Sequence, residues 1–81
     1  MSTLTVELHP QAHNVICTDA AVVVELVDGR TISAPLVWFP RLYQASKEQR
    51  ENWELLGDGN GIHWPEIDED LSVAGLLAVT H

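Results

Sequence analysis

The side chains that could do chemistry in this chain gather in residues 61–70. This segment reads Gly-Ile-His-Trp-Pro-Glu-Ile-Asp-Glu-Asp, and it places the imidazole of His63 shortly before three consecutive acids, Asp68, Glu69 and Asp70. An imidazole and nearby carboxylates can hold a divalent metal ion or act together in acid–base catalysis. The segment therefore supplies a first hypothesis, a small metal-binding or enzymatic domain centred on His63 with Asp68 and Asp70.

That hypothesis lacks a complete motif. The spacing of His63 and the acids matches no tetrahedral or facial-triad metal site, and catalysis would also need a pocket and a group that positions the substrate. The chain contains no activated-serine elbow, no paired-cysteine motif and no dinucleotide fingerprint. We therefore expect a protein that is not an enzyme and uses no metal or other cofactor, with metal binding or catalysis as the alternative.

Two other motifs are better explained by structure. The sequence Gly57-Asp-Gly-Asn-Gly61 lacks the lysine and the hydroxyl residue of a Walker loop, and its acids do not follow the spacing of a calcium loop, so we predict a turn. Cys17 is the only cysteine, which excludes an intrachain disulfide and favours a small core residue in a reducing cytoplasm. A nucleophilic Cys17 paired with His9 or His13 has no supporting pattern.

The charge of the chain argues for a protein partner. Only 4 residues are Lys or Arg against 12 Asp or Glu, which gives a formal net charge of −8. After Arg50 the chain carries acids and no lysine or arginine to balance them. Such a surface repels nucleic acid, whose binding depends on Lys and Arg contacts to phosphate. It favours a basic protein partner and speeds the encounter with it.

The aromatic residues suggest where that partner binds. They lie in one half of the chain and are Trp38, Phe39, Tyr43, Trp53 and Trp64. Some must form the core, but tryptophan is rarely fully enclosed, and an exposed Trp or Tyr beside Arg and acids is typical of a binding hot spot. We therefore predict a partner-binding surface composed of Trp38, Arg41, Tyr43, His63, Trp64, Asp68, Glu69 and Asp70.

Strands are predicted in the first half of the chain. Alternating or β-branched apolar runs mark residues 3–8, 15–17, 21–27 and 30–36. The last two runs form a hairpin, and matching their apolar faces requires a three-residue loop that ends in a left-handed Gly29. This register places Val24 opposite Ile32 and Val22 opposite Ala34.

Short helices are predicted in the second half. Pro40 suits the first turn of one helix, and Ser46 with Gln49 forms a capping box for another over residues 47–53. Ser72 is the expected N-cap of a last helix that ends near Val79.

A small hairpin is predicted between these helices. The glycine-rich turn at residues 57–61 returns the chain as a strand at residues 62–64, which Pro65 ends. The acids at residues 68–70 are then expected to form a turn near the positive end of the last helix.

The order of these elements indicates an α+β fold. We predict a small antiparallel sheet of about three to five short strands, formed by an N-terminal hairpin and a small C-terminal hairpin, with two or three short helices. No repeat, linker or low-complexity tract appears, so residues 1–81 are expected to form one domain. No apolar run can span a bilayer and no signal peptide is present, so we expect a cytoplasmic protein without a membrane partner.

Several blocks of the sequence resemble one bacterial family. They are Asp28-Gly-Arg30, Pro35-Leu-Val-Trp-Phe-Pro-Arg-Leu42, Glu48-Gln-Arg-Glu-Asn-Trp53 and Gly61-Ile-His-Trp-Pro-Glu-Ile-Asp-Glu-Asp-Leu-Ser-Val73. In this order they are similar to the family called domain of unknown function 2442, over nearly the whole chain from Ala21 onward.

The resemblance implies a small α+β domain that occurs alone or joined to a helix-turn-helix DNA-binding segment. Stand-alone members are often encoded beside another small protein, an arrangement that looks like a toxin–antitoxin pair with this family as the antitoxin. Because the chain ends at His81, we expect no helix-turn-helix and no direct DNA binding. A basic, toxin-like protein is the expected partner, with a homodimer or a regulatory module related to DNA-binding regulators as alternatives.

Overall fold

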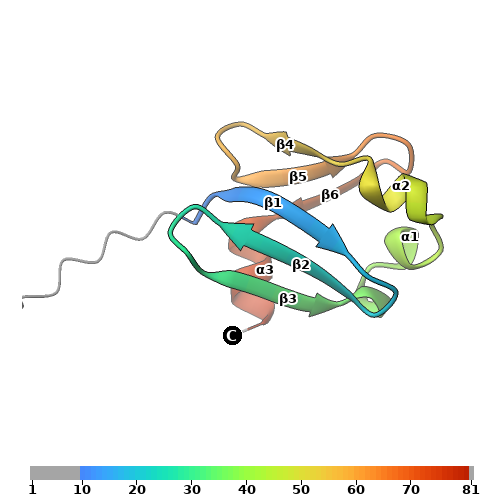
Figure 1. Ribbon diagram of the computed structural model, residues 1–81, viewed down its shortest axis with the longest axis horizontal. Helices are drawn as coiled ribbons and strands as arrows, with labels where there is room; N and C mark the ends of the chain where they lie inside the picture. Colours follow the sequence, from blue (N-terminus) through green and yellow to red (C-terminus); the bar gives the residue numbers. More distant parts are fainter. Residues whose placement is uncertain (1–9, 81) are drawn as a thin grey trace, which may run out of the picture.

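The structure, a computed structural model, describes residues 10–80. Residues 1–9 and 81 lie outside the described part, and with them the strand predicted at residues 3–8. The described elements follow one another along the chain as β1 Ala12–Cys17, β2 Ala21–Leu26, β3 Thr31–Pro35, the 3₁₀ helix η1 Leu36–Trp38, α1 Pro40–Tyr43, α2 Lys47–Glu51, β4 Glu54–Leu56, β5 Gly61–Trp64, β6 Glu69–Ser72 and α3 Val73–Val79 (Figure 1).

Sheet A, made of β1, β2 and β3, has β2 at its centre and only antiparallel pairs. Alternation along β2 buries Val22 and Val24, and β3 contributes the buried Ile32 and Ala34. Val24 lies opposite Ile32 and Val22 opposite Ala34, so the predicted register is confirmed.

The turn between β2 and β3 has the predicted bulge. Gly29 has φ +96°, a left-handed conformation that glycine adopts without steric cost. The backbone N–H of Leu26 donates to the carbonyl oxygen of Arg30 at 2.8 Å and closes the three-residue loop. This loop sets the register that brings both apolar faces to the same side.

Sheet B, made of β4, β5 and β6, contains a strand that the sequence pattern did not predict. β6 pairs with β5, with Ile62 opposite Leu71 and His63 opposite Asp70. Two acids and a serine give β6 a low strand propensity, so its conformation comes from pairing with β5. Glu69 and Asp70 therefore lie in a strand and not in the predicted turn, which falls instead just before β6.

The starts of the helices agree with their capping residues. α1 begins at Pro40, α2 follows Ser46 and α3 follows Ser72, as predicted. The Ser46 hydroxyl accepts from the Gln49 backbone N–H, and the Gln49 side chain accepts from the Ser46 N–H, which is the predicted capping box. α2 ends at Glu51, two residues earlier than predicted, because the chain then turns into β4.

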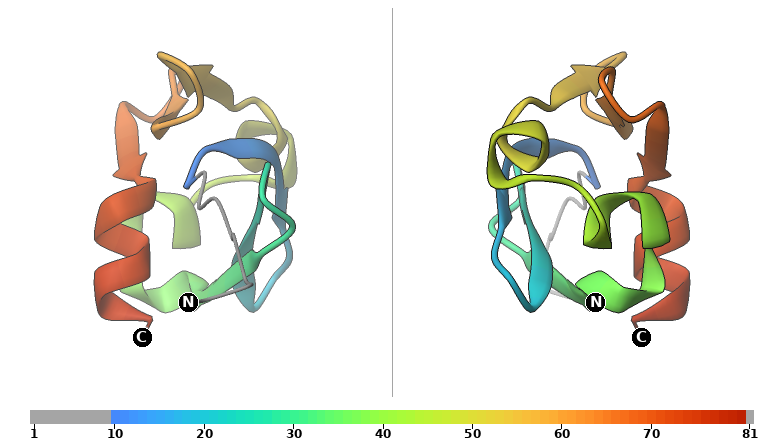
Figure 2. Two further views of the ribbon diagram at one scale, coloured as in Figure 1. Left: turned by 90° about the vertical axis from the view of Figure 1, so that its left-hand side faces the viewer. Right: turned by 90° about the vertical axis from the view of Figure 1, so that its right-hand side faces the viewer.

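One core fills the space between the two sheets and α3. Figure 2 shows sheet A and α3 on opposite sides of the molecule, with sheet B above them. The largest fully buried side chains come from β2, β5, η1, α1 and α3, and they are Trp64, Leu26, Leu36, Leu42, Ile62, Val22, Val24 and Val73. Two antiparallel sheets with three short α-helices among residues 10–80 confirm the α+β class. Within the same residues, no helix has the length and apolar character to cross a membrane.

Gly59 joins the two sheets. It lies in the turn between β4 and β5, and its carbonyl oxygen accepts a 2.7 Å hydrogen bond from the backbone N–H of Ala12 at the start of β1. Its φ is +96°, and a Cβ at this position would collide with the backbone of Ala12. Only glycine combines this φ with so close a backbone contact.

Replacing Gly59 by alanine should destabilise the fold much more than the same change at Gly29. Both glycines have φ +96°, but a Cβ at Gly29 meets no atom within 4 Å. We expect the free energy of unfolding in urea to fall by about 1 kcal/mol for Gly29→Ala and by roughly 3 kcal/mol or more for Gly59→Ala. Equal losses would show that the backbone of Ala12 can shift away from the added Cβ at little cost in free energy.

Candidate functional site

A short segment, residues 36–43, carries exposed aromatic side chains. It comprises η1 and α1, and the buried Leu36 and Leu42 fix it to the core. Trp38 is 49% exposed, Tyr43 is 51% exposed, and Val37 is 61% exposed. Two residues of the predicted binding surface therefore lie in solvent on a backbone that is anchored near both ends.

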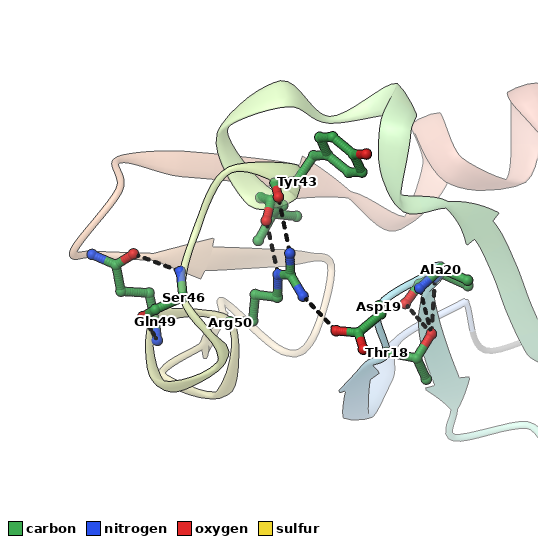
Figure 3. A network of polar contacts seen from close by, with 9 residues as sticks. Thr18, Asp19, Ala20, Tyr43, Ser46, Gln49 and Arg50 are labelled. Carbon is green, nitrogen blue, oxygen red and sulfur yellow. Dashed lines mark hydrogen bonds and ion pairs between the residues drawn. The ribbon is translucent and has the colours of Figure 1, made fainter.

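Arg50 of α2 holds the C-terminal end of this segment (Figure 3). Its Nε donates to the carbonyl oxygen of Leu42 and its Nη2 to that of Tyr43, both at 2.9 Å. A cation that bonds the last carbonyls of a helix is stabilising. The Arg50 side chain is only 12% exposed, and its charge-assisted bond to Leu42 is partly buried, whereas the bond to Tyr43 lies at the surface. The sequence analysis missed this role, since no local signal relates Arg50 to residues 42 and 43.

Trp64 lies in the core, so the prediction that it contacts a partner is wrong. Its exposure is 0%, and its indole N–H donates to the backbone carbonyl oxygen of Arg50 at 3.0 Å. The alternation of β5 turns Ile62 and Trp64 inward and His63 outward. Trp64 instead fixes the backbone of the residue that holds α1.

Arg41 connects α1 to the turn between β5 and β6. Its Nη1 donates to the backbone carbonyl oxygen of Asp68 at 2.5 Å. Asp68 has φ +52°, and Glu69 and Asp70 follow it in β6. The structure therefore brings together Arg41 and Asp68, two predicted binding residues that are far apart in the sequence.

His63 and Asp70 form a pair on the outer face of sheet B. They are cross-strand partners, and Nδ1 of His63 bonds the Asp70 carboxylate. This hydrogen bond raises the pKa of His63 above its usual 6.5 against the opposing effect of burial, and the charges of Asp70, Glu54 and Asp68 raise it further. The pair therefore favours the imidazolium form, whereas a metal ligand or general base must be neutral.

The remaining candidates for chemistry in residues 10–80 are a metal-binding cluster and the Cys17 thiol. Among residues 10–80, no group of three or more His, Cys, Asp and Glu converges to hold a metal ion. Burial raises the pKa of the Cys17 thiol to about 11, although the charge of Arg50 opposes the shift. The thiol is therefore protonated near neutral pH and is a poor nucleophile.

An apolar groove of about 240 Å³ lies between residue 39 and α3. Phe39, Leu71, Leu76 and Val79 line it, together with Asp70. The sequence analysis missed the groove because Phe39 and Val79 are far apart in the chain and meet only through packing. The groove can receive an apolar side chain next to a carboxylate.

A family model described as "Protein of unknown function (DUF2442)" matches residues 12–80. The chain belongs to this family. The predicted resemblance is thereby confirmed. A crystal structure described as a protein of unknown function from Rhodospirillum rubrum ATCC 11170 is similar to this DUF2442 domain, with a TM-score of 0.72 and 37% identity over 85% of this chain and 86% of that one. No curated protein matches the chain significantly.

In this DUF2442 domain, removing the guanidinium of Arg50 should lower the free energy of unfolding much more than removing its ion pair with Asp19. Arg50→Met keeps the apolar stem of the side chain but leaves both carbonyl bonds unmade, and we expect a loss of roughly 3 kcal/mol in the free energy of unfolding. Asp19 lies 3.2 Å from the guanidinium and is fully exposed, so water screens the pair and Asp19→Asn should change the free energy of unfolding little. Urea denaturation measures both. Similar losses would assign the stabilisation to the ion pair.

The stability of the domain should fall as pH rises through the pKa of His63. Because folding raises this pKa above 6.5, the folded state binds the proton more tightly than the unfolded state does. The stabilisation is complete below the unfolded pKa and is lost as pH rises through the higher folded pKa. Asp70→Asn should flatten this part of the profile of urea midpoints between about pH 5 and pH 9. A profile that Asp70→Asn leaves unchanged would contradict the role of the pair.

Proposed function

We propose that this DUF2442 domain is a non-enzymatic interaction module of the bacterial cytoplasm that binds a basic protein, as an antitoxin binds its toxin. The observation that supports this function most is the exposure of Trp38 and Tyr43 on a fixed backbone. Leu36 and Leu42 are fully buried, and Arg50 bonds the carbonyl oxygens at the end of α1. The backbone that carries the aromatic rings therefore needs little ordering when a partner binds.

Exposed aromatic side chains on an ordered backbone favour tight association. Trp and Tyr supply large contact areas at a low cost in conformational entropy, and they are enriched among hot spots. An ordered surface also avoids part of the entropy cost of binding. The groove at Phe39 and Val79 would take an apolar side chain of the partner, and Asp70 would meet a basic one.

The charge distribution favours a basic partner. The three arginines are already engaged, Arg30 with Asp28 at 2.8 Å, Arg41 with the Asp68 carbonyl and Arg50 with α1. Exposed acids in the second half of the chain include Glu48, Glu51, Glu54, Asp58 and Glu66. Their field would speed association with a basic protein, and salt would slow it.

Trp38→Ser should weaken binding to a small basic protein encoded beside this gene, the partner that the family resemblance implies, by roughly 30-fold, because truncating a hot spot costs about 2 kcal/mol. Val27→Ser is the matched control, since Val27 is a similarly exposed apolar residue in the β2–β3 turn and outside the proposed surface. We expect it to leave the affinity unchanged. Isothermal titration calorimetry with both purified proteins measures the effect.

Two outcomes would overturn the proposed function. One is that the adjacent gene product does not bind the unmodified domain. The other is that it binds with an affinity that Trp38→Ser and Tyr43→Ser leave unchanged.

A further inference from the structure

Two hydrogen bonds fix how β3 is oriented against β2. The backbone N–H of Leu26 donates to the carbonyl oxygen of Arg30 at 2.8 Å, and the N–H of Leu36 donates to that of Ala20 at 2.9 Å. In an antiparallel pair, hydrogen-bonded and non-hydrogen-bonded residue pairs alternate. The two bonds therefore determine which residues of β3 face β2 with their backbone groups.

The outer edge of β3 is consequently open. Counting between the two bonds, the backbone groups of Ile32 and Ala34 face β2, while those of Thr31 and Ser33 face away from it. Among the described residues, no backbone or side-chain group from another element bonds Thr31 or Ser33. Pro35 ends the strand and has no N–H to offer. Within residues 10–80, the backbone groups of Thr31 and Ser33 on this edge therefore have no hydrogen-bond partner.

A groove of about 410 Å³ lies beside this edge. Its lining comes from β3 and α3 and consists of Arg30, Thr31, Ile32, Ser33, Leu77 and Thr80. Ile32 is buried and Leu77 packs against the core, so one wall of the groove is apolar. Figure 1 shows β3 at the margin of sheet A, with α3 behind it. Free backbone groups next to an apolar wall are what an added β-strand requires.

Residues 3–8 of the chain have the sequence that this groove requires. They lie outside the described residues and read Thr-Leu-Thr-Val-Glu-Leu, an alternation of polar and apolar side chains without proline. As a strand beside β3, this segment would turn Leu4, Val6 and Leu8 toward the apolar wall. Its polar side chains would lie on the outer face, in line with Thr31 and Ser33.

The length of chain between Gln11 and this segment favours a second copy of the chain as the source of the strand. A strand added beside β3 would lie three strand spacings from β1, about 14 Å. The carbonyl oxygen of Gln11 accepts from Val27 N–H at 2.8 Å, which holds residue 11 next to β2. From Gln11 back to Leu8 the chain spans at most about 11 Å, and it would also have to pass around the β2–β3 turn. In the same chain, residues 7 and 8 are therefore used up in reaching the groove, whereas a second copy can place all of residues 3–8 along it.

We propose that residues 3–8 of a second copy of this chain add as a strand to β3, so that two copies exchange their N-terminal segments. Exchange of identical segments gives a closed, two-fold dimer in which both free edges are covered. This interface uses β3 with Leu77 and Thr80 of α3, whereas the proposed partner surface uses η1, α1 and the groove lined by Phe39, Leu76 and Val79. Because the two surfaces use different residues, dimerisation and partner binding can be tested independently of each other.

Val6→Asp in the full-length chain tests the proposal, with Thr5→Asp as the matched control. Both variants add the same charge at neighbouring positions, but only Val6 would face the apolar wall. We expect analytical ultracentrifugation of the unmodified protein to show a dimer, and Val6→Asp to raise its dissociation constant at least about tenfold. Thr5→Asp should leave the constant near its original value. In the dimer, the amide protons of Thr31 and Ser33 should exchange more slowly than after dilution to the monomer.

Three results would overturn the exchange of segments. The first is a protein that stays monomeric throughout the dilution series. The second is a dimer in which the Thr31 and Ser33 amides exchange freely, or in which both variants dissociate equally. The third is slow exchange of these amides in the monomer, which would mean that the segment folds onto its own chain.

Discussion

The arrangement of α1 and α2 depends on the contacts of one residue, Arg50. Its guanidinium bonds two carbonyl oxygens at the end of α1 and reaches Asp19 in the β1–β2 turn, while its own carbonyl accepts from Trp64 in β5. One residue thereby connects a helix to both sheets. α2, residues Lys47–Glu51, buries no side chain, so its position comes from these polar contacts and from the capping box at Ser46. Charge-assisted hydrogen bonds are strong enough for this role.

The two sheets share a core without sharing a ladder. In residues 10–80, sheet A and sheet B are each three strands wide, and the backbone bond from Ala12 to Gly59 ties the start of β1 to the β4–β5 turn. A three-stranded sheet is too small to bury an apolar face by itself, so each sheet depends on the other and on α3 for its cover. Trp64 is central to this dependence because its ring fills the core and its indole N–H bonds Arg50.

The sequence predicted those features whose causes are local. The bulge at Gly29, the capping box at Ser46 and the N-cap at Ser72 each depend on residues within a few positions, and each is present. β6 was missed because its residues disfavour a strand and only β5 makes it one. Trp64 was placed on the surface because composition suggests that some aromatic residues are exposed, but only the sheet determines which. The bond from Arg41 to Asp68 and the groove at Phe39 join distant segments, which no local pattern could reveal.

The lack of buried side chains in α2 leaves its surface free to diverge in evolution. Lys47, Glu48 and Glu51 are exposed, and their replacement would disturb neither the core nor the capping box. α2 lies beside α1 in Figure 1, so such changes would alter the charge next to the aromatic segment while its geometry is preserved. Duplicated copies of the gene could in this way acquire different partners on one scaffold. Repulsion between like charges, rather than a change of shape, would then prevent each copy from binding the partner of the other copy.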